Sequence, residues 1–262
     1  RSGLASTHKN RAAAVVLAFF SFFSLSWMMV PDLPLFLGWT LAFTGTWALC
    51  FSQSKKLDYW KVGLGVALSI LSKFSGILVL FSVGLALFCW APPRVRRKAI
   101  WGVGLGFVAA VLPTLYWNAQ HEWGSLLFQL RDRHTGAALS GVRWLRFWVV
   151  EAVLMGPALL VYTGVLFWRT WQTRKRAEGR LLLFFGAWIF PATIFWIQPL
   201  FSDFKLHWAF IAWWPVVLAM ARNVSQDSPR WARLHIAYGF VLGVVILQIG
   251  RASCRERVSS PV

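Results

Sequence analysis

One short stretch, residues 112–134, carries most of the side chains that could bind a polar ligand. It follows an apolar run and sets amides, histidines and arginines beside Tyr116, Trp117 and Trp123. Amides and imidazoles can bond sugar hydroxyls, arginine pairs with phosphate, and a tryptophan ring can stack on a sugar. The alternative is an aromatic belt at a membrane surface. The candidate binding residues are Asn118, Gln120, His121, Arg131, Arg133 and His134.

Four more polar residues stand beside apolar runs, namely Asp32, Lys73, Lys205 and His207. An intramembrane lysine is costly unless it faces a cavity or a partner, so Lys73 is predicted to be functional and, as a compact cation, to suit a phosphate. Its alternative role is to reach the lipid headgroups from a short helix. Asp32 lies between two prolines and is either a site residue or a helix N-cap. Lys205 and His207 precede a later apolar run, where they indicate a cavity mouth.

The composition is that of a membrane protein. Hydrophobic residues make up 58% of the chain and charged residues only 14%, whereas soluble domains have about 25% charged residues. The net charge of +18 comes from small clusters between apolar runs, which argues against nucleic-acid binding. The three cysteines form no CxxC pair, and no soluble-enzyme motif is present.

Seven apolar runs are close to the length of about 20 residues that a membrane span needs. An eighth run, 62–91, is too long for one helix without strong tilt and is interrupted at Lys73 to Gly76. It is either one overlong helix with a buried lysine or a hairpin of two short helices, and the distribution of Lys and Arg favours the hairpin. The chain is therefore predicted to be all-α, a polytopic membrane bundle of about nine spans. The seven single runs are 12–30, 35–52, 99–117, 147–168, 181–200, 206–221 and 234–248.

The distribution of Lys and Arg predicts the orientation of these spans. With a hairpin at Lys73, most basic residues fall on one side, which the positive-inside rule makes cytoplasmic. The clusters at 55–61, 94–98 and 174–180 all belong to that side. Asp32, Lys73, the 112–134 stretch and the 203–207 segment then share the outer side, where a polar site is expected.

Four segments together resemble a family of enzymes. They are PDLPL at 31–35, GLGVALSILSKFSGILVL at 63–80, LPTLYWNAQHEWGSLLFQLRDRH at 112–134 and KLHWAFIAWWP at 205–215. Over roughly residues 12–248 the chain resembles bacterial GT-C-fold glycosyltransferases that use polyprenyl-phosphate sugars. These are related to dolichyl-phosphate-mannose protein mannosyltransferases and to the lipid A aminoarabinose transferase.

The resemblance implies a GT-C-like fold and sugar transfer from a polyprenyl-phosphate donor to a lipid, glycan or protein acceptor. The reaction would occur at the outer face of a bacterial cytoplasmic membrane, with Lys73 near the carrier phosphate. The resemblance places the catalytic carboxylate in a loop before residue 1, so catalytic residues are unknown and this chain is expected to be an inactive fragment. The lipid-phosphate donor is the only cofactor-like molecule implied, and a divalent metal is possible but not indicated. The alternative function is a transporter or flippase for lipid-linked sugars.

Two domains are predicted. Residues 1–248 form the transmembrane domain, which begins at Arg1 and is expected to lack preceding spans. Residues 249–262 are expected to be a non-native tail, because 249–258 resembles the translation of a sequencing-adapter oligonucleotide.

Overall fold

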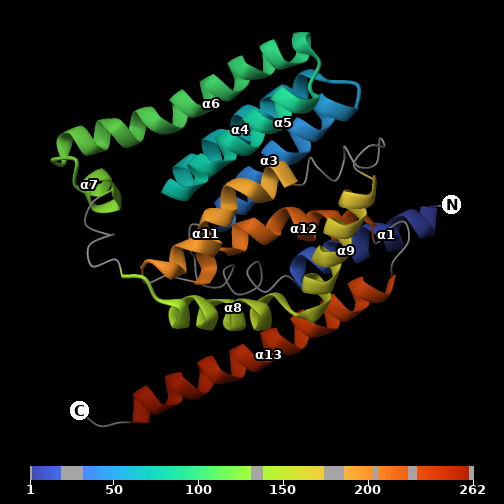
Figure 1. The fold of residues 1–262 in the computed structure, drawn as a ribbon, viewed down its shortest axis with the longest axis vertical. Coiled ribbons are helices and arrows are strands. Elements are labelled where there is room, and N and C mark those ends of the chain that lie inside the picture. Colours follow the sequence, from blue (N-terminus) through green and yellow to red (C-terminus); the bar gives the residue numbers. More distant parts are fainter. Residues whose placement is uncertain are drawn as a thin grey trace.

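The computed structural model describes residues 2–18, 32–130, 138–173, 186–202, 206–223 and 229–259 (Figure 1). Within these ranges all regular elements are helices and none is a strand. The all-α fold class is therefore confirmed for the described part of the chain.

The N-terminal half forms a layer of four helices that run in alternating directions (Figure 1). Helix α3 packs against α4 and α5, and α4 also packs against α6. Glycines let α4 and α6 approach closely, since a Cβ added at Gly63 would lie 2.7 Å from the Gly102 carbonyl oxygen. The four helices are α3 (Asp32–Phe51), α4 (Lys56–Ser72), α5 (Leu78–Trp90) and α6 (Pro93–Gln120).

The hairpin predicted for residues 62–91 is confirmed. Helix α4 has 17 residues and ends at Ser72, Lys73 is extended with φ −162° and ψ 144°, and the short 3₁₀ helix η1 (Phe74–Ile77) leads into α5. Gly76 sits against the Ser69 carbonyl, where the backbones leave no room for a side chain. The two arms therefore meet in the tight turn that the Ser-Lys-Phe-Ser-Gly sequence indicates.

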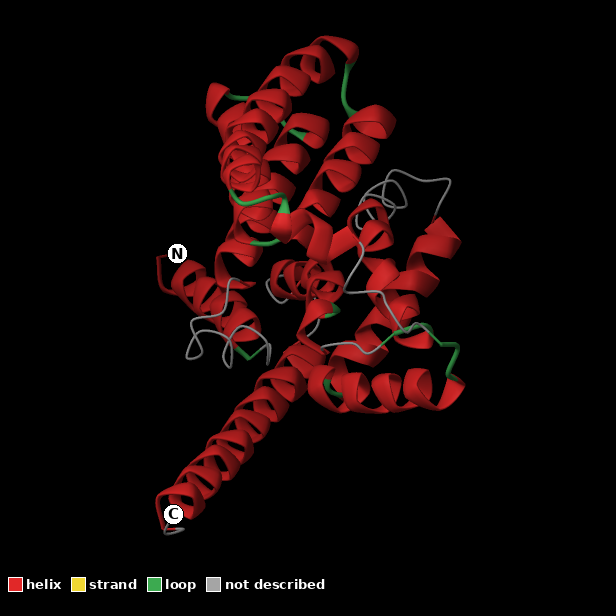
Figure 2. Ribbon diagram, turned by 90° about the vertical axis from the view of Figure 1, so that its left-hand side faces the viewer, coloured by secondary structure: helices red, strands yellow, loops and turns green. Residues whose placement is uncertain are grey.

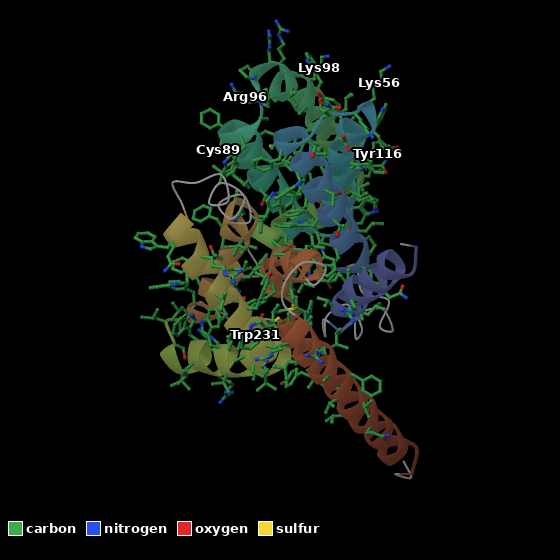
Figure 3. The ribbon with its side chains drawn as sticks, turned by 90° about the vertical axis from the view of Figure 1, so that its right-hand side faces the viewer. Lys56, Cys89, Arg96, Lys98, Tyr116 and Trp231 are labelled. Atoms are coloured by element: carbon green, nitrogen blue, oxygen red, sulfur yellow. The ribbon has the colours of Figure 1, made fainter. Side chains whose placement is uncertain are left out.

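The four-helix layer has two chemically different ends. At one end the thiol of Cys50 lies 3.7 Å from the Ala86 carbonyl oxygen, and the exposed Lys56 and Lys98 lie nearby (Figure 3). At the other end Asp32 meets Lys73. Three residues of the 112–134 stretch, Thr114, Leu115 and Leu126, line a cavity together with Lys73, so this part of the stretch lies at the same end.

Helix α12 (Phe210–Asn223) is the centre of the molecule. Almost all of its described side chains are buried, which is typical of a core helix. Trp214 donates to the hydroxyl of Thr40 on α3 over 2.9 Å, whereas Trp213 faces the other half of the molecule. At 14 residues, about 21 Å, α12 is shorter than a bilayer core of about 30 Å, so the run 206–221 is a buried helix rather than a lipid-facing span.

The run 147–168 was predicted as one span, and this is wrong in one respect. Helices α8 (Gly141–Met155) and α9 (Pro157–Thr173) meet at Gly156 with a bend of 100°. Gly156 has φ 79°, which glycine adopts without strain, and the following proline cannot continue the hydrogen-bond ladder of α8. The segment is therefore a broken span or a re-entrant element.

The described part of the run 181–200 is also not one regular helix. From residue 190 onward it consists of short turns, because Pro191 and Pro199 each remove a backbone donor. These turns are η3 (Phe190–Thr193), α11 (Ile194–Ile197) and η4 (Gln198–Leu200).

The terminal helices complete the fold. Helix α1 (Ser2–Leu17) packs against α12 and α13, while residues 19–30 of the predicted first span lie outside the described residues. Helix α13 (Pro229–Ser259) extends well beyond the other helices and continues past residue 248 (Figure 2).

Two of the described helices, α3 and α6, are long and apolar enough to cross a membrane, and the bent α8–α9 pair makes a third if it counts as one span. Only 17% of the apolar window of α6 is buried, and aromatic side chains such as Trp101 and Tyr116 are exposed on it. So much exposed apolar surface suits a lipid environment.

Candidate functional site

An ion pair occupies the turn between α4 and α5. The ammonium group of Lys73 lies 2.9 Å from Asp32 Oδ1 and 5.9 Å from the ring centroid of Trp208. The Asp32 side chain is only 2% exposed, and its second oxygen, Oδ2, has no hydrogen-bond partner among the described residues. Lys73 is 18% exposed, so its cation is reachable while its partner is buried. The turn thus presents a positive charge backed by a carboxylate.

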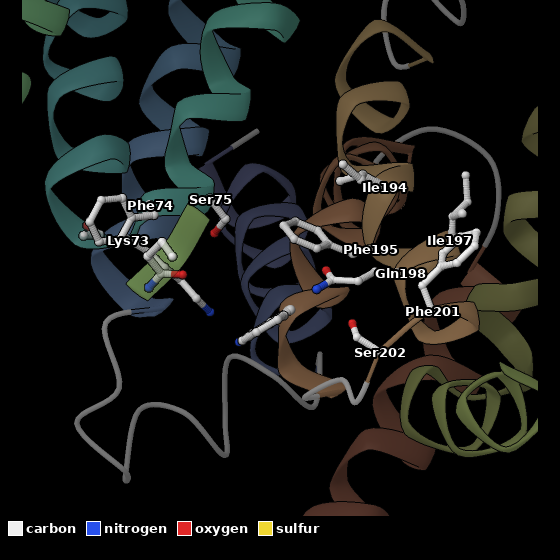
Figure 4. A pocket seen from close by; sticks show the side chains of 12 residues that line it. Lys73, Phe74, Ser75, Ile194, Phe195, Ile197, Gln198, Phe201 and Ser202 are labelled. Carbon is white, nitrogen blue, oxygen red and sulfur yellow. The ribbon is translucent and has the colours of Figure 1, made fainter. Parts of the chain in front are cut away.

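The Lys73 turn forms one wall of a cavity of about 690 Å³. In Figure 4, Lys73 and Ser75 lie on one side of this space, and Phe195, Gln198 and Ser202 lie on the other. The size is within the range of small-molecule sites, about 300–1,000 Å³. The polar residues that line this main cavity are Ser72, Lys73, Ser75, Gln129, Gln198 and Ser202, and its aromatic residues are Phe74, Phe195, Phe201 and Trp208.

A second cavity, of about 330 Å³, lies on the α6 side of Lys73. It shares Ser72, Lys73 and Phe74 with the main cavity, but its other walls are almost wholly apolar. We call it the apolar groove; its apolar lining includes Ile70, Leu71, Ile77, Phe107, Val111, Leu115 and Leu126. Lys73 therefore lies between an aromatic cavity that has several polar residues in its lining and a groove whose other residues are almost all apolar.

Asn118 has a structural role that its sequence context did not reveal. It is 1% exposed, and its Oδ1 accepts hydrogen bonds from Ser125 Oγ at 2.8 Å and Leu126 N at 3.2 Å. Its amide nitrogen donates to the Thr114 carbonyl at 2.9 Å. These bonds hold the elbow between α6 and α7 (Gly124–Leu130), where Glu122 and Trp123 both have positive φ. Asn118 also lines a small hollow of about 310 Å³, but its amide is already engaged by the protein.

The remaining predicted site residues are only partly placed. Gln120 and His121 are exposed at the end of α6, and the His121 ring stacks on Trp117 at 4.1 Å, outside the cavities described above. His207 is half-buried in η5 (Leu206–Trp208), with its ring 6.4 Å from that of Trp208. Four predicted residues lie outside the described residues: Arg131, Arg133, His134 and Lys205.

Arg143, which was not predicted as a site residue, shapes the far wall of the main cavity. Its guanidinium donates to the carbonyl oxygens of Pro199 at 2.9 Å and Leu200 at 3.3 Å. The backbone N–H of Ser140 donates to Leu200 O at 2.8 Å, which ties the start of α8 to η4. Arg143 therefore positions the turn that carries Gln198. Gln198 itself could have been found, since it is an amide within a long apolar run.

Glu151 is a further buried carboxylate among the described residues. It is fully buried in α8, and its Oε1 accepts a hydrogen bond from Trp213 Nε1 at 2.8 Å. It lines none of the cavities described above. In the described structure Glu151 therefore forms a contact between α8 and the central helix α12.

The main cavity combines a mostly apolar surface with several groups that could bind a polar or anionic part of a ligand. It offers one cation, two amides and three hydroxyl groups, which can all donate hydrogen bonds, beside aromatic rings that can stack on a sugar. Among the described residues, no group of three or more His, Cys, Asp or Glu side chains could hold a metal ion.

Comparison of the chain with protein-family models, with curated proteins and with solved structures found no match.

Proposed function

We propose that the chain binds a polyprenyl-phosphate-linked sugar at Lys73 and takes part in transferring the sugar to a lipid, glycan or protein acceptor. The observation that carries the proposal is the position of Lys73 between the main cavity and the apolar groove. A lipid-linked sugar has the same three parts in the same order, namely a polar sugar, an anionic phosphate and an apolar chain. The two cavities and the cation between them match that order.

Charge at the site supports a phosphate ligand. When the sugar leaves a lipid phosphate, negative charge builds up on the phosphate oxygens, and a fixed cation stabilises that charge more than the ground state. Lys73 is held in place by Asp32, 2.9 Å away, so little reorganisation is needed when the charge develops. The half-exposed hydroxyl and amide groups of the cavity would then bind sugar hydroxyls.

The difference in charge between the two ends of the helix layer supports an orientation of the proposed site in the membrane. Exposed lysines and arginines mark the end opposite Lys73, which the positive-inside rule assigns to the cytoplasm. We therefore place the Lys73 end at the outer face of a bacterial cytoplasmic membrane, in a bundle of about nine spans.

The proposal is tested by donor binding. The chain is reconstituted in vesicles, and retention of a radiolabelled polyprenyl-phosphate sugar is measured for the unmodified chain, Lys73→Met and Lys61→Met. Lys61 is a matched control because it also pairs with an aspartate, Asp58 at 3.2 Å, but at the opposite end of the layer. Lys73→Met is expected to weaken binding roughly tenfold, about 1.4 kcal/mol, whereas Lys61→Met leaves it unchanged. The double variant Asp32→Asn with Lys73→Met, which leaves no unpaired buried carboxylate, should show the same loss of binding. Equal binding by all of these chains would contradict the proposal.

A transporter for lipid-linked sugars is the second candidate, and the bend of 100° at Gly156 favours it, because transporters use broken helices. Measurements on the same vesicles distinguish a transporter from a transferase. A transporter moves labelled donor between leaflets without an acceptor, whereas a transferase of this class leaves the donor in its leaflet and releases the sugar only to an acceptor.

A further inference from the structure

The end of the helix layer opposite Lys73 carries a dense group of exposed cations. Two corners of the chain meet there, the α3–α4 connection and the start of α6, since the Tyr59 carbonyl oxygen lies against Gly102. Figure 3 shows Lys56 and Lys98 close together at this end. We call the group the basic rim; it consists of Lys55, Lys56, Arg94, Arg97 and Lys98, all of which are exposed.

Among the residues that the structure describes, no carboxylate forms an ion pair with a side chain of the basic rim. The carboxylate nearest in sequence, Asp58, is buried and already accepts hydrogen bonds from Lys61 Nζ and from the Lys55 backbone. No acidic residue stands in the first turn of α6, although the positive end of the helix dipole disfavours cations there. An external anion would relieve both sources of repulsion.

Exposed tryptophans lie one helical turn below the cations, in the same arrangement on two neighbouring helices. Trp60 follows Lys56 by four residues on α4, and Trp101 follows Arg97 by four residues on α6, so each pair shares a helix face. Trp60 is 73% exposed and Trp101 is 76% exposed, although burial would be expected of such large rings in water. A cation above a tryptophan is the arrangement that fits the headgroup region of a bilayer.

We propose that the basic rim and the two tryptophans below it bind the headgroups of anionic phospholipids. The positive charge of the rim favours an anionic ligand. The two exposed tryptophan rings favour a membrane surface over a soluble anion, because each ring needs an apolar phase on the side away from the headgroups. A lone basic cluster would also suit nucleic acid, but the exposed apolar surface of α6 that continues below Trp101 excludes a solvated polyanion partner. This site is independent of the Lys73 cavity, which lies at the other end of the helices.

The test is photocrosslinking in lipid nanodiscs. The full chain is placed in zwitterionic nanodiscs with a trace of a diazirine-bearing phosphatidylglycerol or, in parallel, of the matching phosphatidylcholine. Labelled peptides are then mapped by mass spectrometry. The basic-rim variant carries Arg94→Gln, Arg97→Gln and Lys98→Gln. The control carries Arg11→Gln, Arg146→Gln and Arg230→Gln, three exposed arginines outside the rim, so the two variants have the same net charge.

The phosphatidylglycerol probe is expected to label residues 55–61 and 94–101 roughly tenfold more than the phosphatidylcholine probe. The basic-rim variant should lose this preference and the control should keep it. Raising the salt concentration should also remove the preference for the phosphatidylglycerol probe in the unmodified chain. This measurement does not depend on whether a variant folds. Equal labelling by both probes, or an unchanged preference in the rim variant, would overturn the proposal. Competition by inorganic phosphate at constant ionic strength would assign the rim to a soluble anion instead.

Discussion

The ammonium of Lys73 and the carboxylate of Asp32 lie 2.9 Å apart, although 41 residues separate them in the sequence. Each of the two charges compensates the other. The aspartate makes a lysine between two apolar helices tolerable, and the lysine compensates a carboxylate that is 2% exposed. The pair also joins the start of α3 to the α4–α5 turn, so the candidate site and the hairpin depend on one contact.

Breaking this pair should cost more than removing it. Lys73→Met leaves Asp32 buried and unpaired, a loss of about 3–5 kcal/mol, whereas the double variant Asp32→Asn with Lys73→Met removes both charges. We expect the double variant to be the more stable of the two in thermal unfolding in detergent. Additive losses in a double-mutant cycle would show that the two side chains are not coupled.

Helices α4 and α6 should separate if a methyl group is added between them. A Cβ on Gly106 would collide with the Gly63 carbonyl oxygen, so Gly106→Ala is expected to lower stability by about 1–3 kcal/mol. Gly104→Ala is the matched control on the same helix, because nothing lies within 4 Å of its added Cβ. Equal melting temperatures for the two variants would contradict this close packing.

Substitutions of Asn118 and of Gln120 should have different effects on stability, although both residues carry amides in one short segment. Asn118→Ala removes the acceptor of Ser125 and Leu126 and should destabilise the elbow by about 1–3 kcal/mol. Gln120 is exposed, so Gln120→Ala should leave the melting temperature unchanged. Proteolysis near residue 122, which reports opening of the elbow, should increase only in the first variant.

The elbow between α8 and α9 should not accept a side chain. Gly156 combines φ 79° with a contact in which an added Cβ would lie 2.5 Å from the Tyr238 ring. Gly156→Ala should therefore cost about 1–3 kcal/mol, while Gly164→Ala on α9, with open space around it, should be neutral or slightly stabilising. Denaturant unfolding of the two variants provides the comparison.

Gln198 should contribute to ligand binding without contributing to folding, if the proposed function holds. Gln198→Leu keeps the size of the side chain and removes its amide, so donor retention is expected to fall roughly tenfold at an unchanged melting temperature. Gln172→Leu, an exposed position on α9, should change neither quantity. Unchanged donor binding in the first variant would remove Gln198 from the site.

Local sequence signals predicted the features that depend on local chemistry. The run 62–91 exceeded the bilayer thickness and contained a polar interruption, and only a hairpin at Lys73 left most Lys and Arg on one side. The long apolar helices α3 and α6 likewise follow from composition. The segregation of cations from the polar end is visible in the sequence once the hairpin is placed.

Features that depend on packing could not be read in the same way. The amide of Asn118 looked like a ligand-binding group because its true partners, Ser125 and Leu126, become neighbours only when the chain reverses after α6. The far wall of the main cavity depends on Arg143, which caps carbonyls more than fifty residues away. The break at Gly156 did carry a signal, a glycine followed by a proline, but the apolar run around it concealed the signal.

The glycine contacts between α4 and α6 have a mechanical consequence. Backbones in such close contact pack over a continuous interface, so we expect the turn at Lys73 and the elbow at Asn118 to move together. The opposite wall of the main cavity is built instead from the short turns between residues 190 and 202, which lack a continuous ladder of backbone bonds. If the main cavity widens to admit a bulky ligand, the movement is therefore expected in that wall, while the ammonium group of Lys73 keeps its position.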